Sequence, residues 1–312
     1  MRSLVLGSAA LVLTTLVPVA AGAQRGTERD RDREFQEAQS RIDTTFAFNR
    51  SGVVDLTQIS GDVVVTSWDR AEARVRAYAE RGRVRSSLSS SRLSLGIESV
   101  RGRVGDSRFE VTVPVGVRVI ARSTSGDVSV KGTKGPVEAT STSGDVEVSD
   151  ATDRIVIESV SGDVRASQLT GDVRSEAVSG TIEIRDVNGD IRAETTSGDV
   201  SLTRVVSRSV VTTTVSGETE YEGTIDAAGR YEFHAHSGDI RLEIPDATSA
   251  QFSIETFSGS LDTEFALTLQ PGQRTTSRPR RFEFTLGSGS ARVSAESFSG
   301  DIVLVKRARS GR

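Results

Sequence analysis

Regularly spaced aspartates are the residues of this chain whose type and pattern could do chemistry. They follow glycines at intervals of 18 residues or a multiple of 18, and a second set lies halfway between. The first set is Asp127, Asp145, Asp163 and Asp199, and the second is Asp172 and Asp190. If the repeat stacks, carboxylates of one set lie about 5 Å apart and repel one another unless hydrogen bonds or a cation offset the charge.

Three interpretations of this aspartate column are open. Each side chain can bond the backbone of its own turn, bind calcium weakly, or form part of a functional ligand surface. Calcium-binding nonapeptide repeats carry two glycines in the pattern GGxGxD, whereas this chain has one glycine per turn, and Thr181, Glu218 and Ser260 interrupt the column. We therefore expect structural capping and no metal or cofactor, with only weak metal candidates, namely Asp127, Asp145, Asp163 and Asp199.

Other patterns for catalysis or metal binding are absent or incomplete. His234 and His236 stand at i and i+2 and could share a metal, but no third ligand stands out. The chain has no cysteine and no GxSxG, GxxxxGK[ST] or HExxH motif. A polysaccharide-active solenoid needs a groove with aromatic platforms, and the single tryptophan, Trp68, and the three tyrosines do not cluster with acids in the repeat. We expect a protein that is not an enzyme.

A sequence repeat with a period of nine residues positions the aspartate side chains. A half-turn of nine residues must reverse direction sharply, and glycine reaches positive φ without strain. A fixed period with turn residues and β-branched residues locked to it is typical of stacked coils. The turn glycines are Gly126, Gly144, Gly162, Gly180 and Gly198, with Gly135, Gly171 and Gly189 halfway between them.

Apolar residues keep the same period. The first expected inward column is Val128, Val146, Val164, Ile182 and Val200; the second is Val130, Val148, Ala166, Ile184 and Leu202; the third, in the other half-coil, is Val137, Ile155, Val173 and Ile191. Outward positions between the first two carry Ser129, Glu147, Arg165, Glu183 and Ser201. The pattern predicts two short strands per coil, and hence an all-β, right-handed parallel β-solenoid (β-helix-like) with about 18–21 residues per coil over residues 42–306.

The flanking coils are less regular. Alternation over residues 71–80 and 109–119 predicts half-buried strands. After Gly198 the spacing lengthens, and the next turn glycines are Gly217, Gly238, Gly259 and Gly300. Counted from Gly61 to Gly300, these spacings predict about thirteen coils.

The two termini of the chain and its charge composition indicate the cellular compartment of the protein. Residues 1–23 resemble a secretory signal, with a basic start, an apolar stretch and small residues before Gln24. Residues 24–41 are expected to be a charged linker or N-terminal cap, and residues 307–312 a basic tail. The interspersed charges, with a net charge of −4, argue against nucleic acid as a partner. We expect export to the periplasm, cell surface or medium, with no stable membrane insertion after signal cleavage; the oligomeric state stays open.

The segment VTVPVGVRVIARSTSGDVSVKGTKGPVEATSTSGDVEV (residues 111–148) resembles the core of the bacterial putative-adhesin domain family, a group of unknown function. SGDVVVTSWD (60–69), SGDIRLEIPD (237–246) and SFSGDIVL (297–304) match other recurring segments of that family. The resemblance covers nearly all of the chain after residue 23. It implies a β-solenoid exported to the cell envelope, with adhesion as the suggested role and no catalytic residues to transfer.

These observations favour a non-enzymatic envelope or cell-surface protein, an adhesin or scaffold that binds a glycan or another protein of the envelope through the solenoid faces. The outward residues Glu147, Arg165 and Glu183 are the candidate binding face. Two alternatives remain: a calcium-stabilised structural solenoid and a polysaccharide-active β-helix enzyme.

Overall fold

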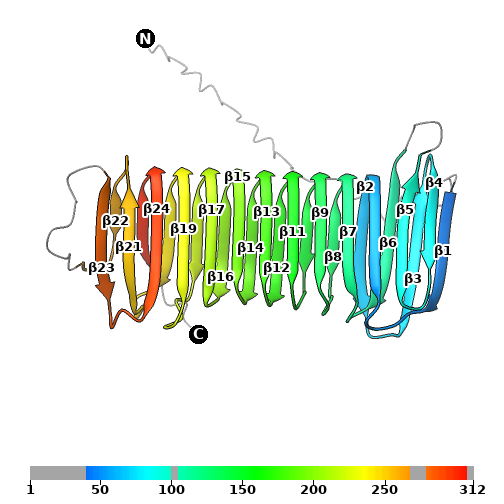
Figure 1. Ribbon diagram of the computed structural model, residues 1–312, viewed down its shortest axis with the longest axis horizontal. Coiled ribbons are helices and arrows are strands. Elements are labelled where there is room, and N and C mark those ends of the chain that lie inside the picture. The colour runs from blue at the N-terminus through cyan, green and yellow to red at the C-terminus, as the bar shows by residue number, and fades with distance from the viewer. Residues whose placement is uncertain (1–39, 100–104, 268–278, 308–312) are drawn as a thin grey trace, which may run out of the picture.

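The computed structural model describes residues 40–99, 105–267 and 279–307. Within these ranges the chain forms 25 β-strands and no helix, which confirms the all-β prediction. Figure 1 shows the strands side by side across the long axis, from β1 and β4 at one end to β22 and β23 at the other. None of the described residues forms a helix that could span a membrane. The predicted signal, residues 24–39 and residues 308–312 lie outside the described part.

Two sheets face each other and share β2, whose first half pairs in one sheet and second half in the other. In spatial order, sheet A consists of β1 (Ser40–Ala47), β3 (Glu72–Ala79), β6 (Ser107–Pro114), the second half of β2 (Val53–Trp68), β8 (Val128–Lys131), β10 (Val146–Ser149), β12 (Val164–Thr170), β14 (Ile182–Asn188), β16 (Val200–Val206), β18 (Thr219–Gly223), β20 (Ile240–Pro245), β25 (Ile302–Arg307) and β22 (Leu261–Thr263).

Sheet B covers the other side of the core. Its spatial order is β4 (Arg83–Leu88), β5 (Arg92–Glu98), the first half of β2, β7 (Arg118–Ser125), β9 (Val137–Ser143), β11 (Ile155–Ser161), β13 (Val173–Ser179), β15 (Ile191–Ser197), β17 (Ser209–Ser216), β19 (Arg230–Ser237), β24 (Ala291–Ser299), β21 (Ala250–Thr256) and β23 (Arg280–Leu286). In this spatial order, every neighbouring pair of strands between β7 and β24 is parallel, as a solenoid requires.

The core is the set of inward columns expected from the repeat. Val128, Val146 and Val164 are register partners in sheet A, and Val137, Ile155 and Val173 are register partners in sheet B. All six are buried. Because each coil contributes small β-branched side chains, a narrow interior is filled with few aromatic residues.

The stacking order at the two ends differs from the chain order. The coil of β24 and β25 lies between that of β19 and β20 and that of β21 and β22 (Figure 1). At the other end, β2 lies between β6 and β8 in sheet A. The outer strands β1, β3, β4 and β23 pair antiparallel. The 18-residue spacing identifies neighbouring coils in the central block, whereas at the two ends the spacing of turn glycines does not.

Candidate functional site

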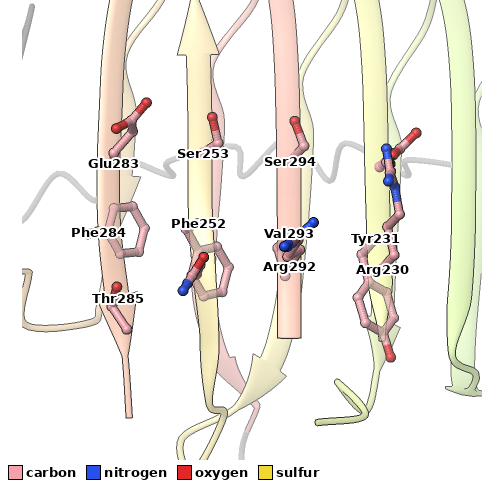
Figure 2. A pocket seen from close by; sticks show the side chains of 12 residues that line it. Arg230, Tyr231, Phe252, Ser253, Glu283, Phe284, Thr285, Arg292, Val293 and Ser294 are labelled. Atoms are coloured by element: carbon pink, nitrogen blue, oxygen red, sulfur yellow. Dashed lines mark hydrogen bonds and ion pairs between the residues drawn. The ribbon is translucent and has the colours of Figure 1, made fainter. Parts of the chain in front are cut away.

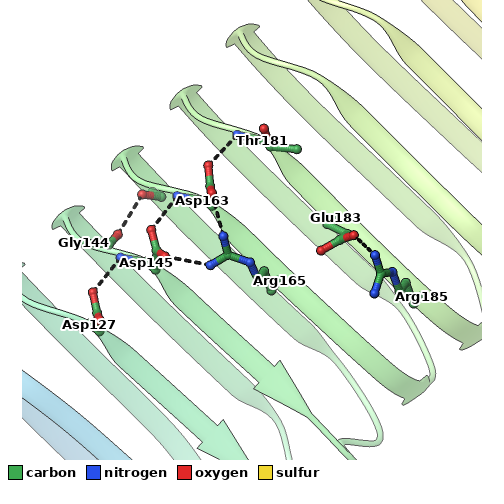
Figure 3. A network of polar contacts seen from close by, with 9 residues as sticks. Asp127, Gly144, Asp145, Asp163, Arg165, Thr181, Glu183 and Arg185 are labelled. Atoms are coloured by element: carbon green, nitrogen blue, oxygen red, sulfur yellow. Dashed lines mark hydrogen bonds and ion pairs between the residues drawn. The ribbon is translucent and has the colours of Figure 1, made fainter. Parts of the chain in front are cut away.

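The turn that leads from sheet B to sheet A repeats one set of hydrogen bonds. The N–H of Gly144 donates to the carbonyl oxygen of Ser161 in the next coil at 3.0 Å. Asp127 Oδ1 accepts the N–H of Asp145 at 2.9 Å, and Asp145 Oδ1 accepts the N–H of Asp163 at 2.9 Å (Figure 3). The bonds expected within each turn instead run to the neighbouring coil, because parallel stacking brings the next N–H within reach of the carboxylate.

A buried hydroxyl completes the turn. Ser141 Oγ donates to the carbonyl oxygen of Gly126 at 3.0 Å, and Ser297 Oγ donates to that of Gly238 at 3.1 Å. Both serines are buried, so these bonds satisfy polar groups that could not reach water. Three kinds of hydrogen bond therefore join each turn to the next: backbone N–H to carbonyl oxygen, backbone N–H to aspartate Oδ1, and serine hydroxyl to carbonyl oxygen.

The predicted binding face is largely occupied by its own ion pairs. Arg165 donates from Nη1 to Asp145 Oδ2 and from Nη2 to Asp163 Oδ2, each at 2.7 Å (Figure 3). The hydrogen bond to Asp145 raises the pKa of Arg165 above its ordinary value. Glu183 is ion-paired with Arg185. These side chains are solvent-exposed or half-buried, so each pair adds only about 0–1 kcal/mol to stability, and the guanidinium of Arg165 already holds two carboxylates.

The weak metal candidates are placed in the turns, with backbone N–H groups as partners of their Oδ1 atoms. The fourth of them, Asp199, accepts the N–H of Glu218 at 2.8 Å. In the halfway set, Asp190 Oδ1 accepts the N–H of Ser209 at 3.1 Å. Across residues 40–99, 105–267 and 279–307, no cluster of three or more His, Cys, Asp or Glu side chains could hold a metal ion.

One turn aspartate gives a testable pH dependence. Asp301 Oδ1 accepts the N–H of Ser260 at 2.7 Å and its hydroxyl at 2.9 Å. The backbone bond first, and the hydroxyl bond second, lower the pKa of Asp301 below its ordinary 3.8. A carboxyl with a lowered folded-state pKa stabilises the fold above its unfolded-state pKa, and this stability is lost as pH falls through the folded value. We expect the free energy of unfolding of Asp301→Asn to fall less steeply below about pH 4 than that of the unaltered protein. Urea unfolding at a series of pH values from 7 to 2.5 measures this dependence. An equally steep fall in both proteins contradicts the lowered pKa of Asp301.

A second column, on the outer face of sheet B, presents apolar side chains to solvent. It is formed by the residue that precedes Ser-Gly at each turn, and we call it the apolar ladder. Six of the eight exposed large hydrophobic residues in the described part of the chain belong to it. In stacking order its members are Ile59, Thr124, Thr142, Val160, Val178, Thr196, Val215, His236, Phe298 and Phe257.

The ladder ends in three stacked rings. The centroids of His236 and Phe298 are 5.0 Å apart with an interplanar angle of 8°, and those of Phe298 and Phe257 are 4.8 Å apart with an angle of 3°. Phe298 is nevertheless 49% exposed and Phe257 40% exposed. Since both faces of Phe298 are covered by neighbouring rings, its exposed surface is the ring edge.

Acidic residues flank the ladder on both sides. Two residues before the ladder position, on sheet B, the acids are Glu158, Glu176, Glu194, Glu296 and Glu255; three residues after it, in the turns, they are Asp62, Asp127, Asp145, Asp163, Asp199, Glu218, Asp239 and Asp301. Some of them are paired, for example Glu176 with Arg174 at 2.5 Å and Glu255 with Arg281 at 2.6 Å. The rows nearest to the ladder are thus predominantly acidic, with Arg122 in the sheet B row, and Arg174 and Arg192 lie in the next row outward.

Two shallow hollows lie between the ladder and the sheet B acids. One, of about 450 Å³, follows the ladder from Thr142 to Val215, and the other, of about 440 Å³, lies beside Val215 and the three rings. Small buried residues such as Ser159 and Ala177 form the base. The two hollows together follow the ladder from Thr142 to Phe257.

A third hollow, of about 380 Å³, lies across β19, β24, β21 and β23 on the same sheet (Figure 2). Arg230 and Arg292 line one row, and Ser294, Ser253 and Glu283 line the next. Arg230 is ion-paired with Glu232. The hollow carries charges of both signs, and it lies on the coils that also carry the ring stack.

The apolar ladder was not predicted from the sequence, although its signal is present there. The predicted columns consist of residues that follow each turn glycine and leave out the residue before Ser-Gly. His236, considered from the sequence only as one half of an incomplete metal pair, is stacked in the ladder, whereas His234 lies in the acidic row with Nδ1 3.4 Å from Glu296 Oε2. Reading the position before Ser-Gly down the chain yields Ile, Val, Thr, His and Phe, where a solvated strand usually alternates to polar residues.

The fold and its turns define a β-solenoid repeat protein with a long outer face. The chain belongs to the Toastrack DUF4097 family, whose model matches residues 117–170 and 176–305. This confirms the resemblance to a putative-adhesin domain of unknown function, although the match begins at Val117 and leaves out the 60–69 segment. No curated protein matches the chain.

Solved structures similar to the chain include the following three. A putative adhesin from Bacteroides fragilis has 11% identity and a TM-score of 0.45, covering 86% of this chain and 99% of its own. A putative cell adhesion protein from Clostridium sporogenes has 7% identity and a TM-score of 0.21, covering 86% and 100%. A putative lipid binding protein from Parabacteroides distasonis has 12% identity and a TM-score of 0.33, covering 86% and 97%.

Proposed function

We propose that this chain is a non-enzymatic binding protein of the bacterial envelope or cell surface that holds a protein partner along the apolar ladder. Among residues 40–99, 105–267 and 279–307, six of the eight exposed large hydrophobic residues align in one column, and this alignment carries the proposal. Single exposed apolar side chains are ordinary on a soluble protein, whereas a contiguous exposed patch is typical of an interaction site. Export is supported by the signal-like residues 1–23.

The ring stack favours a protein over a glycan as the partner. Sugar rings pack against the open face of an aromatic side chain, and Phe298 has a ring against each of its faces. Exposed ring edges and valine methyl groups suit the apolar side chains of another protein. The predicted face around Arg165 has weaker support, since its guanidinium is already bonded to Asp145 and Asp163.

A co-sedimentation experiment tests the proposal. The purified protein is mixed with envelope fractions of its host bacterium, and the saturable bound fraction is measured. The ladder variant is Val160→Thr, Val178→Thr and Val215→Thr combined; threonine already occupies three rungs, so we expect stability to change by no more than about 1 kcal/mol. We expect at least tenfold weaker association for this variant, and loss of association when the fraction is first digested with protease.

Two control variants sharpen the comparison. Leu88→Thr with Val206→Thr removes the two exposed large hydrophobic residues that lie outside the ladder, and should leave association unchanged. Arg165→Gln with Glu183→Gln tests the face predicted from the sequence. The proposal is wrong if the ladder variant still associates with the envelope fraction, or if only the Arg165→Gln, Glu183→Gln variant loses association. If association persists after protease digestion of the fraction but is lost after glycan hydrolysis, the partner is a glycan.

A further inference from the structure

We infer that the partner segment is a basic amphipathic α-helix lying along the solenoid axis, with its apolar stripe on the apolar ladder. This inference rests on the proposed function and adds the shape and charge of the occupant. Its evidence is the spacing of the rungs and the acids on both sides of them.

The spacing argument compares two periods. Rungs recur at about 4.8 Å, the separation of neighbouring strands, and an α-helix presents its apolar stripe once per turn, at about 5.4 Å. The difference of about 0.6 Å per rung accumulates to half a rung only after about four turns, or about 15 residues. An extended strand presents same-side residues at about 6.7 Å, which is out of register by the second rung. A helix of about four turns therefore fits the ladder, and an extended peptide does not.

The regular part of the ladder offers a site of that length. Val160, Val178, Thr196 and Val215 are four consecutive rungs, and three of them are valine. A hollow of about 450 Å³ follows the same four rungs. The next rung, His236, begins the ring stack, which supplies the largest apolar contact beyond the valines.

The charge argument defines the flanks of the helix. Along these rungs the sheet B side carries Glu158, Glu176 and Glu194, and the turn side carries Asp163, Asp199 and Glu218. Glu176, Glu194 and Asp163 are each ion-paired with an arginine of this chain, so the charge argument rests chiefly on the other three acids. If Lys or Arg residues border the apolar stripe of the helix, they are attracted to the acidic rows on both sides of the ladder. Acidic residues in the same positions of the helix would be repelled by both rows. Burial of the stripe also lowers the local dielectric, so the flanking ion pairs gain strength on binding.

Fluorescence anisotropy with labelled synthetic peptides tests the inference. The probe is a helix-forming peptide of about 15 residues with leucines at helical spacing and lysines on either side of the stripe. One control has the same composition rearranged to strict alternation, and the other has every Lys replaced by Glu. We expect at least tenfold tighter binding of the basic helix than of either control, and weakening of that binding as salt rises.

The protein variants locate the binding. The Val160→Thr, Val178→Thr, Val215→Thr variant should bind the basic helix at least tenfold more weakly, and the Leu88→Thr, Val206→Thr variant should bind as the unaltered protein does. Equal binding of the alternating peptide overturns the helical geometry, equal binding of the acidic helix overturns the charge assignment, and equal binding by the ladder variant overturns the site. If envelope association depends on the ladder but the basic helix does not bind, the inference is wrong and the proposed function stands. If the ladder variant associates with the envelope as the unaltered protein does, both the inference and the proposed function are wrong.

Discussion

Gly162→Ala is expected to destabilise the protein by about 2–4 kcal/mol, since it combines a glycine-only backbone conformation with an overpacked contact. Gly162 has a φ of +147°, and a Cβ at this position would lie 2.2 Å from the carbonyl oxygen and 2.6 Å from the carbonyl carbon of Gly144 in the neighbouring coil. Those atoms are backbone, so no side-chain rotation relieves the contact. Urea unfolding followed by circular dichroism measures the change.

Gly96→Ala is the matched control. Gly96 lies in β5 without a positive φ, and a Cβ added to it would have the carbonyl oxygen of Thr57 as its nearest atom, at 3.9 Å, an ordinary contact. This substitution should change stability by less than about 0.5 kcal/mol. Equal effects at the two positions, large or small, would show that the turn glycines are not selected by the close approach of stacked coils.

Removal of the last coil is expected to unfold strands that precede it in the chain. Deleting residues 291–312 removes β24 and β25, which lie between β19 and β21 and between β20 and β22. The strands β21, β22 and β23 then lose the parallel neighbour that joins them to the rest of the sheets. Hydrogen exchange measured by mass spectrometry should show complete loss of protection over residues 250–263 and 280–286, with an opening free energy near zero.

The same experiment separates two stacking orders. If coils stacked in chain order, β21 would remain paired with β19 after the deletion, and its amides would stay protected. Protection of the central strands β9 to β15 serves as the internal control, because repeats in a solenoid depend chiefly on their immediate neighbours. Protected amides in β21 of the shortened chain contradict the inserted position of β24.

The repeating part of the fold could be predicted from the columns of the sequence. The register of Val146 with Val128 and Val164 follows directly from the 18-residue spacing, because side chains at equivalent positions of successive coils must face the same way. The irregular ends could not be predicted this way. Gly300 stacks on Gly238, and Gly259 stacks on Gly300, an order decided by which coils pack together after the chain has turned back on itself.

The surfaces were predicted less well than the core. Glu147, Arg165 and Glu183 were chosen because they point outward, but pointing outward does not reveal whether a charge is already paired. Arg165 is bonded to Asp145 of the neighbouring coil and to Asp163 of its own coil, contacts that depend on side-chain rotamers. The apolar ladder was within reach of sequence reasoning, because exposure follows from alternation, and Val160 and Val178 are apolar where alternation predicts a solvated position.

The bonds that stitch each turn to the next have a consequence for how such a chain can change over generations. A duplication of one 18-residue unit brings its own glycine, aspartate and buried hydroxyl, and therefore inserts between existing coils without requiring a compensating substitution. It also adds one residue to the exposed column, lengthening the outer face by about 4.8 Å. The reach of this surface can thus be adjusted in equal increments by gene duplication, whereas an interface made of loops would have to be rebuilt for each new length.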